Sequence, residues 1–315
     1  MPGRLHDSGD VLVVGAGALG GYLAARLAAS GQRVAVVARG QRRKEIQQHG
    51  LVLDMEGRRR VVRVPCHCIT ARSPAADLVI LATKTTSLSE VLAEIGYWAK
   101  PPRALLTLQN GVEAPDIAAH CLPEVEVIAA RVHGFFKLAN GVVVHEGVAP
   151  DFAFGAWRSP DGIETDLLEA RFTAAGIPFS CPSDIAAALW EKFLLASTIG
   201  SVGAATGITI GRLRETPEHW SLLGAAMREV QQLAAARGVR LPHDCVTRTL
   251  DFVASFPPNA TSSLQRDLMD RRESEYDVLT GAVVRMGGEC GLLQPTHARI
   301  EAQLIRNGML GAEAV

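Results

Sequence analysis

The stretch Val11–Gly20, with the sequence VLVVGAGALG, constrains the fold of this chain more than any other feature. Its first four residues are apolar and mostly β-branched, as is typical of a buried parallel strand. The glycines that follow form a G-x-G-x-x-G pattern, and residues 21–30 continue at helical spacing. A second strand is predicted at 33–38. This order of strand, glycine turn, helix and strand predicts a Rossmann-type βαβ unit.

Each glycine of the pattern has a mechanical task in such a unit. Gly15 permits the tight turn, Gly17 lets the backbone approach a pyrophosphate, and Gly20 lets the helix pack closely on the strand. The first N–H groups of the helix then bind the anion. We therefore expect a dinucleotide cofactor at Gly15, Ala16, Gly17, Ala18, Leu19 and Gly20.

The residue at the end of the second strand predicts which dinucleotide binds. Sites for NAD usually place Asp or Glu there, to accept hydrogen bonds from the ribose hydroxyls. This chain has Arg39, whose guanidinium can pair with a 2′-phosphate instead. Arg39 therefore favours NADP, whereas the following Arg42, Arg43 and Lys44 are interpreted as a solvated helix start.

Composition narrows the class of protein. The 315 residues are enough for two domains, and a net charge of −1 gives no general attraction to nucleic acid or anionic membranes. Cys66 and Cys68 flank a histidine, but no second ligand pair follows at metal-binding spacing, so no metal is predicted. The polar stretch 1–10 is no signal segment, and no run of about 18 apolar residues occurs. A cytoplasmic protein is expected.

The pattern of elements changes once along the chain. Further buried strands are predicted at 77–82, 104–108, 125–133 and 177–180, with a hairpin at 51–65 and an antiparallel segment at 141–155. After 183 strand signals nearly vanish, and helices are predicted at 184–206, 218–237, 243–255, 275–288 and 295–307. We therefore expect an α/β fold: a Rossmann-type doubly wound sheet in domain 1–182, followed by an all-α domain, 183–315.

Polar residues follow two of the predicted strands at their carboxyl ends, where doubly wound sheets bind ligands. Lys84 follows the strand at 77–82 and is expected to contact phosphate or ribose unless it is a solvated lysine. Asn110 follows the strand at 104–108 and precedes a glycine, so it is either a turn residue or a hydrogen-bonding partner near the nicotinamide.

The helix predicted at 184–206 carries a lysine on a face of small residues. Lys192 shares this face with Ala196, Gly200 and Gly203, which would leave room for a ligand, although a lysine there can also extend to solvent. Burial lowers the pKa of a lysine and suits it to protonate a developing alkoxide. Farther along, Ser262 is expected to cap a helix start that could also bind a carboxylate.

Together these features resemble the ketopantoate reductase family. The resemblance is carried by GAGALG, Lys84, Gln109-Asn110-Gly111, Trp190-x-Lys192 and SSL-x-x-D…R-x-SEYD, and it runs from Val11 to about Ile305. It implies NADPH-dependent reduction of a 2-oxo acid, in this family 2-dehydropantoate of pantothenate biosynthesis, between a Rossmann and a helical domain. It further implies that Lys192 is the proton donor, Asn110 contacts cofactor and substrate, Ser263 holds the substrate and Glu275 lies beside the cofactor.

The chain departs from this family where the substrate is recognised. Four family asparagines are replaced by Ala196, Gly200, Ile210 and Ala260. Losing buried amide contacts at roughly 1 kcal/mol each would weaken binding of a hydroxylated substrate. Ser197, Ser201, Thr206 or Asn259 could replace these amides through a rearranged network.

We therefore expect a small 2-oxo acid substrate whose identity the sequence does not give. The alternatives are a related 2-hydroxy acid dehydrogenase with an apolar pocket and a redox sensor that binds NADP(H) without turnover. The presence of Lys192 argues against the sensor. No nucleic acid or membrane partner is expected; a homodimer is compatible with the sequence, which does not define the oligomeric state.

Overall fold

Residues Val11–Val14 form β1 in the computed structural model, which describes residues 10–55, 57–70, 76–157 and 163–311. Most of the polar segment 1–10 therefore lies outside the described residues. Alternate side chains of β1 enter two cores: Val11 and Val13 pack into one cluster, and Leu12 and Val14 into another. Because both faces of the strand are buried, β1 is apolar without interruption, which confirms the predicted strand.

The described strands make one ten-stranded sheet. After β1 they are β2 (Val34–Val37), β3 (Leu51–Met55), β4 (Arg58–Val62), β5 (Cys66–His67), β6 (Leu78–Leu81), β7 (Ala104–Thr107), β8 (Glu126–Ala139), β9 (Val142–Trp157) and β10 (Phe179–Ser180). The order across the sheet is β4-β3-β9-β8-β7-β6-β1-β2-β5, with β10 paired to β9. The β1, β2, β6, β7 and β8 pairings are parallel, while β3–β4 and β8–β9 are antiparallel, so the sheet is mixed.

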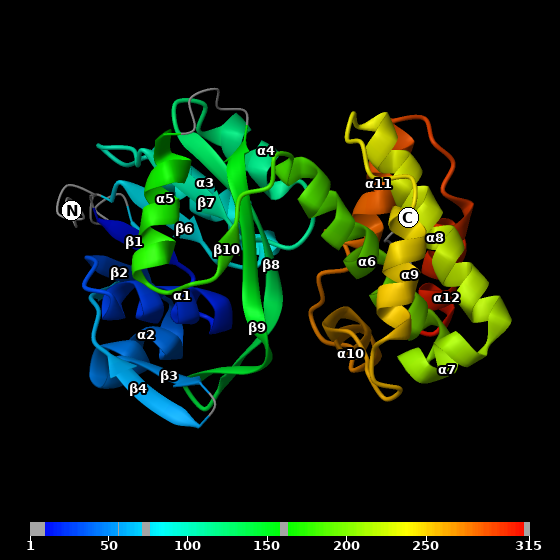
Figure 1. Cartoon of the computed structure of the whole chain (residues 1–315), viewed down its shortest axis with the longest axis horizontal. Helices are drawn as coiled ribbons and strands as arrows, with labels where there is room; N and C mark the ends of the chain where they lie inside the picture. The colour runs from blue at the N-terminus through cyan, green and yellow to red at the C-terminus, as the bar shows by residue number, and fades with distance from the viewer. Residues whose placement is uncertain (1–9, 56, 71–75, 158–162, 312–315) are drawn as a thin grey trace. The chain divides into compact units, whose positions relative to one another are not determined.

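Helices cover both faces of this sheet (Figure 1). In this part of the chain they are α1 (Ala18–Ala29), α2 (Gly40–His49), the 3-10 turn η1 (Thr85–Ser87), α3 (Leu88–Gly96), α4 (Ala114–Cys121) and α5 (Ile163–Ala174). Apolar residues of α1 and α5 complete the core that contains Val11, whereas those of α3 and α4 complete the core that contains Leu12. The α/β architecture expected for the first half is confirmed.

The chain divides into two compact units. The N-terminal unit is Met1–Gln109 with Glu113–Ile185, and the helical unit is Ala186–Val315 with the short segment Asn110–Val112. The helical unit contains α6 (Ile185–Thr206), whose first residue belongs to the N-terminal unit, and then α7 (Ile210–Glu215), α8 (Pro217–Ala236), α9 (Cys245–Ala254), α10 (Ser263–Met269), α11 (Thr280–Glu289) and α12 (Pro295–Arg306). Within it α8 contacts α7, α9, α11 and α12. The expected all-α second half is confirmed.

Helix α6 is the longest helix of the described chain and its sequence is mostly apolar. By length and composition it is the one described helix that could cross a membrane, although 61% of its apolar window is buried inside the protein. Its apolar residues therefore form core contacts, as in the central helix of many helical domains.

Two features of the helical unit differ from the sequence prediction. The helix predicted from 275 begins at Thr280, because residues 276–279 form a turn whose Tyr276 side chain is hydrogen-bonded to Glu301. The short helices α7 and α10 were not predicted as separate elements. Ser262 caps α10, since its hydroxyl accepts the N–H of Gln265 at 3.0 Å, as expected for this serine.

Candidate active site

The turn after β1 is built as the glycine pattern requires. Gly15 has φ +101°, and a Cβ there would lie 2.7 Å from the Ala82 carbonyl, so only glycine fits. A Cβ on Gly20 would lie 1.9 Å from the Gly15 oxygen, which explains the need for glycine where α1 crosses the turn. Gly17, in contrast, faces open space.

This open space fits a phosphate group. Gly17 is the N-cap residue of α1, it has no capping side chain, and the first turn of the helix carries no acidic residue. The N–H groups of Ala18 and Leu19 at the helix start are therefore suited to bind an anion. The residues present fit the pyrophosphate of a dinucleotide.

Arg42 supports this turn, contrary to the sequence interpretation. Its Nε donates to the Ala16 oxygen at 2.8 Å and its Nη1 to the Gly141 oxygen at 2.8 Å, and its side chain is only 14% exposed. Arg42 is thus a half-buried structural group and not part of a solvated helix start. Sequence reasoning missed it because both acceptors are backbone carbonyls, one of them 99 residues away.

Arg39 lies at the end of β2, where it was expected. It is the N-cap residue of α2, it is exposed, and its guanidinium pairs with Glu90 at 3.1–3.2 Å. Both side chains are more than half exposed, so the ion pair is weak and leaves Arg39 available to a stronger anion. Contact with a 2′-phosphate stays a prediction.

Buried polar atoms without a partner gather at the carboxyl ends of β6 and β7. Gln109 Nε2 donates to the backbone oxygens of Leu81 and Thr83, but Gln109 Oε1 and Thr83 Oγ1 are buried with no hydrogen-bond partner among the described residues. Such atoms are costly unless water or a ligand satisfies them. They fit a polar ligand at this edge, where a nicotinamide is expected. Lys84 lies beside them and is exposed.

Three predicted site residues are joined by hydrogen bonds in the helical unit. Lys192 Nζ donates to Asn110 Oδ1 at 2.8 Å, and Asn110 Nδ2 donates to Glu275 Oε2 at 2.8 Å. Lys192 lies on α6 and Glu275 precedes the turn before α11, whereas Asn110 directly follows Gln109 at the end of β7. The structure therefore connects an ammonium, an amide and a carboxylate in one chain of hydrogen bonds, the Lys192–Asn110–Glu275 chain.

Gly111 explains how Asn110 reaches this position. It has φ +91°, and a Cβ there would lie 2.8 Å from the Val278 oxygen. The loop thus passes against the turn that carries Glu275, at a distance that only glycine allows. Gly111 thus forms the turn, and Asn110 is thereby placed to bond both Lys192 and Glu275.

Ser263 is the fourth predicted site residue. It is the first residue of α10, and it is exposed. No described hydrogen bond joins it to the Lys192–Asn110–Glu275 chain, so contact with a substrate carboxylate stays a prediction.

The small residues that follow Lys192 do not leave the room that the sequence suggested. A Cβ on Gly200 would lie 2.8 Å from both Leu264 Cβ and Ser262 Oγ, and one on Gly203 would lie 2.5 Å from Gln265 Oε1. These glycines are needed because α10 packs directly on α6. The prediction that Gly200 and Gly203 leave space for a ligand is therefore wrong; Ala196, which is half-buried, stays a candidate pocket residue.

The hydroxyl groups of α6 make bonds within their own helix. Ser197 donates to the Phe193 oxygen at 2.6 Å, Ser201 to the Ser197 oxygen at 2.9 Å and Thr206 to the Val202 oxygen at 2.7 Å. Ser197 and Ser201 are also fully buried. Because their protons are used inside the helix, these hydroxyls do not offer a donor in place of the missing amides in this arrangement.

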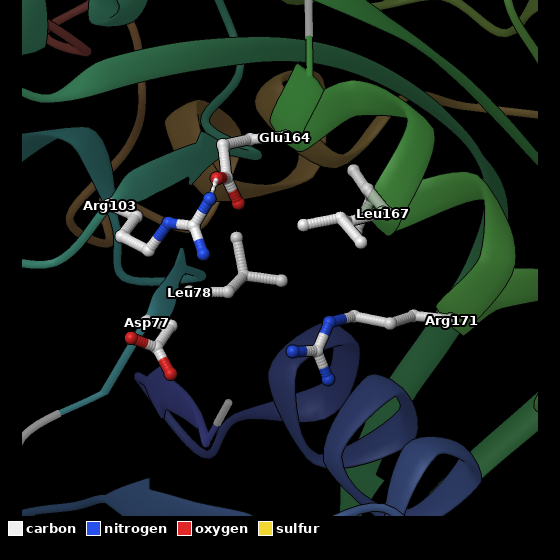
Figure 2. Close-up of a pocket in the computed structure, with 7 residues that line it drawn as sticks. Asp77, Leu78, Arg103, Glu164, Leu167 and Arg171 are labelled. Atoms are coloured by element: carbon white, nitrogen blue, oxygen red, sulfur yellow. Dashed lines mark ion pairs between the residues drawn. The ribbon is translucent and has the colours of Figure 1, made fainter. Parts of the chain in front are cut away.

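A small pocket elsewhere in the N-terminal unit is not a substrate site. Figure 2 shows it lined by Asp77, Arg103 and Arg171, with Arg103 paired to Glu164. It lies where β6 and β7 begin, at the end of these strands opposite the edge where a ligand is expected, and its volume of about 10 Å³ suffices for one water molecule.

Metal ligands do not gather among the described residues, where no three His, Cys, Asp or Glu side chains could hold an ion together. Cys66 is buried, and burial raises the pKa of its thiol, so it stays protonated rather than becoming a metal-binding thiolate.

Comparison with known families identifies the architecture. Residues 11–159 match the ketopantoate reductase PanE/ApbA family, and residues 184–307 match its C-terminal domain. The chain belongs to the ketopantoate reductase family. It is therefore an oxidoreductase of that family, with both of the family's domains.

The sequences of several relatives align with this chain over almost its whole length. It is 28% identical to the 2-dehydropantoate 2-reductase of Halobacterium salinarum over 94% of this chain and 97% of the relative, and 29% identical to that of Mesorhizobium japonicum over 88% and 91%. The crystal structure of a PanE/ApbA family ketopantoate reductase from Ralstonia eutropha has a TM-score of 0.82 at 31% identity, covering 95% of this chain and 99% of that one.

The fold also serves another substrate. D-mandelate dehydrogenase, solved with NADH and anilino(oxo)acetate, has a TM-score of 0.84 at 20% identity, with 95% of this chain and 99% of that one covered. At this identity the likeness concerns the fold alone.

Proposed function

We propose that this chain reduces a 2-oxo acid to the 2-hydroxy acid with NADPH as the hydride donor. The Lys192–Asn110–Glu275 chain of hydrogen bonds carries the proposal, because it places a lysine ammonium on an amide oxygen that a carboxylate orients. The cofactor residues would be the Gly15–Gly20 turn, Arg39, Lys84, Asn110 and Glu275. The relatives named 2-dehydropantoate 2-reductase support the reaction class.

In the proposed reaction each side chain has a separate role. When bound, the dihydronicotinamide supplies a hydride to the C2 carbonyl carbon. Lys192 donates a proton to the carbonyl oxygen and stabilises the developing alkoxide with its charge. Asn110 Oδ1 holds the ammonium by a hydrogen bond, and Glu275 holds the amide. Ser263 would bind the substrate carboxylate.

A second candidate is a dehydrogenase of apolar 2-hydroxy acids within the same family. It is supported by Ala196 in place of a family asparagine and by the α6 hydroxyls, which are bonded within their own helix. D-mandelate dehydrogenase, which shares the fold, was solved with an aryl-substituted 2-oxo compound. In this candidate the proton and hydride chemistry is the same and the pocket differs.

The test is oxidation of NADPH or NADH by the purified protein with a panel of 2-oxo acids, followed by the absorbance of the reduced cofactor. We expect turnover that Lys192→Ala abolishes while NADPH affinity stays within about twofold, since the lysine acts in the transition state. Lys100→Ala is the control, because Lys100 is an exposed lysine paired with Asp77. NADPH binding without oxidation by any 2-oxo acid would instead support the redox sensor.

A further inference from the structure

The carboxylate of Glu275 occupies an irregular part of the helical unit. Residues 276–279 form a turn, and α11 begins only at Thr280, so helix geometry does not fix where Glu275 lies. Its bond to Asn110 spans 165 residues of sequence and is 2.8 Å long. Something outside the turn must therefore hold the turn in place.

Thr280 provides one attachment at the end of the turn. Its Oγ1 donates to the backbone oxygen of Ser197 at 2.7 Å, and both residues are fully buried. Ser197 lies on α6, the helix that carries Lys192. A threonine at a helix start usually bonds within its own helix. Here the hydroxyl instead ties the beginning of α11 to the lysine helix.

Tyr276 provides the second attachment, next to Glu275 itself. Its hydroxyl donates to Glu301 Oε1 on α12 at 2.8 Å; Tyr276 is 3% exposed and Glu301 8%. Burial and the adjacent carboxylate raise the pKa of Tyr276, so the phenol stays a donor at any physiological pH. The Gly281 N–H also donates to the backbone oxygen of Tyr276 at 2.9 Å.

Val278 lies in the same turn, and it brings the turn against the loop that carries Asn110 and Gly111. The Val278 oxygen lies so close to Gly111 that a Cβ on Gly111 would be 2.8 Å away. A shift of the turn toward the loop would therefore cause a collision, and a shift away from it would lengthen the Glu275–Asn110 bond. Asn110 Nδ2 donates to the Glu275 carboxylate, so the other end of the amide, Oδ1, faces the Lys192 ammonium. The carboxylate therefore sets the orientation of the amide, because only Nδ2 can donate to it.

We propose that Tyr276 and Thr280 are positioning residues for the lysine: they hold the turn that keeps Glu275 on Asn110, and thereby keep Asn110 Oδ1 on the Lys192 ammonium. The functional part of this inference rests on the reductase activity proposed above; the structural part concerns the free protein. It goes beyond the assigned site residues, because neither side chain contacts the reacting groups.

The test removes one hydroxyl at a time. Tyr276→Phe and Thr280→Val are compared with Tyr22→Phe and Thr249→Val. Among the described residues, the Tyr22 hydroxyl is buried without a hydrogen-bond partner, and the Thr249 hydroxyl donates to the Cys245 oxygen of its own helix. Thr280→Ser keeps the hydroxyl and should behave like the wild-type protein. The first readout is the pH at which the Lys192 amine of the cofactor-free protein is half-labelled by acetic anhydride, determined by peptide mass spectrometry.

We expect this labelling midpoint to fall in Tyr276→Phe and Thr280→Val, and to stay in place in both controls and in Thr280→Ser. The direction follows because the ammonium loses its oriented acceptor. Thermal melting identifies folded variants. An unmoved midpoint in folded Tyr276→Phe and Thr280→Val would overturn the proposal.

The second readout is turnover of the best 2-oxo acid. We expect kcat to fall between about tenfold and a hundredfold in the two variants with KM for NADPH unchanged, since misplacement of a catalytic group by about 1 Å has this cost. An unchanged kcat in both would overturn the role in catalysis. A moved midpoint in a protein that reduces no 2-oxo acid would support the positioning and contradict the reductase.

Discussion

Gly200 on α6 lies directly beneath Leu264 on α10: a Cβ on the glycine would be 2.8 Å from the Leu264 Cβ. The position where the family resemblance implies a substrate-binding asparagine is therefore filled by a neighbouring helix. The close approach of α10 makes Gly200 a packing residue rather than a vacant place in a pocket.

Restoring the asparagine should consequently destabilise the protein. We expect Gly200→Asn to lower the free energy of unfolding by about 1–3 kcal/mol, the usual cost of overpacking a close contact. Urea unfolding measures this change. Gly207→Asn is the matched control, because Gly207 faces open space and asparagine tolerates its φ of +71°. Equal stability of Gly200→Asn and wild type would show that α10 moves away easily.

Arg39 should determine the preference between NADPH and NADH. We expect Arg39→Asp to erase or reverse the ratio of kcat/KM for the two cofactors, since an aspartate repels the 2′-phosphate and accepts the ribose hydroxyls. An unchanged ratio would show that the arginine has no contact with the phosphate.

If Arg39 binds the 2′-phosphate as proposed, Glu90 would compete with that phosphate for the guanidinium, because the two side chains form an ion pair. Glu90→Gln should therefore tighten NADPH binding by up to about fivefold, the scale of an exposed ion pair, and leave NADH binding unchanged. Titration of protein fluorescence with each cofactor gives both affinities. Tighter binding of both cofactors alike would mean that Glu90 acts elsewhere than at the 2′-phosphate.

The residues that differ from the family's expected recognition set should change the substrate specificity. We expect kcat/KM for an unhydroxylated branched 2-oxo acid to exceed that for ketopantoate by about tenfold, since each apolar group contributes roughly 1–3 kcal/mol of discrimination. Ala196 and Ala260 are half-buried and stay candidate pocket residues, whereas Ile210 is 4% exposed and belongs to the core. Ketopantoate as the better substrate would show that Asn259 or another group compensates.

Glu229 should make the stability of the helical unit sensitive to acid. Burial would raise its pKa, but hydrogen bonds from the His297 ring and from the N–H groups of Thr296 and His297 lower it overall. A lowered pKa in the folded state stabilises the protein above the unfolded value of about 4.5, and this contribution is lost as pH falls through the folded value.

Glu229→Gln should therefore be less stable than wild type at pH 7, by about 1–3 kcal/mol, with the difference shrinking below pH 4.5. Glu218→Gln, an exposed residue on the same helix, is the control. Urea unfolding at a series of pH values tests this. A difference that is independent of pH would mean that the carboxylate charge does not contribute.

Local chemistry was enough to predict the cofactor end of the fold. Apolar residues in Val11–Val14 require burial on two faces, and Gly20 is required because a Cβ there would collide with the Gly15 oxygen of the same turn. Gly15 has a positive φ, which is local, but the collision that a Cβ would make there is with the distant Ala82 carbonyl. The expected halves, α/β and then all-α, followed from hydrophobic periodicity, which depends only on nearby residues. Lys192 and Asn110 became candidates because of a helix face of small residues and the carboxyl end of a strand, whereas the role of Glu275 came from the family resemblance alone.

Contacts between distant segments decided the rest. The bonds that join Lys192 to Asn110 and Asn110 to Glu275 span 82 and 165 residues, so no local pattern indicates their geometry. The residues before Thr280 have helical spacing, but tertiary bonds of Tyr276 and Thr280 hold a turn there. From the sequence, Gly200 was expected to leave space for a ligand. A glycine on a helix face, however, is compatible either with a pocket or with a closely packed neighbouring helix. Only the position of α10 distinguishes the two, since close packing fills whichever space the fold brings a neighbour into.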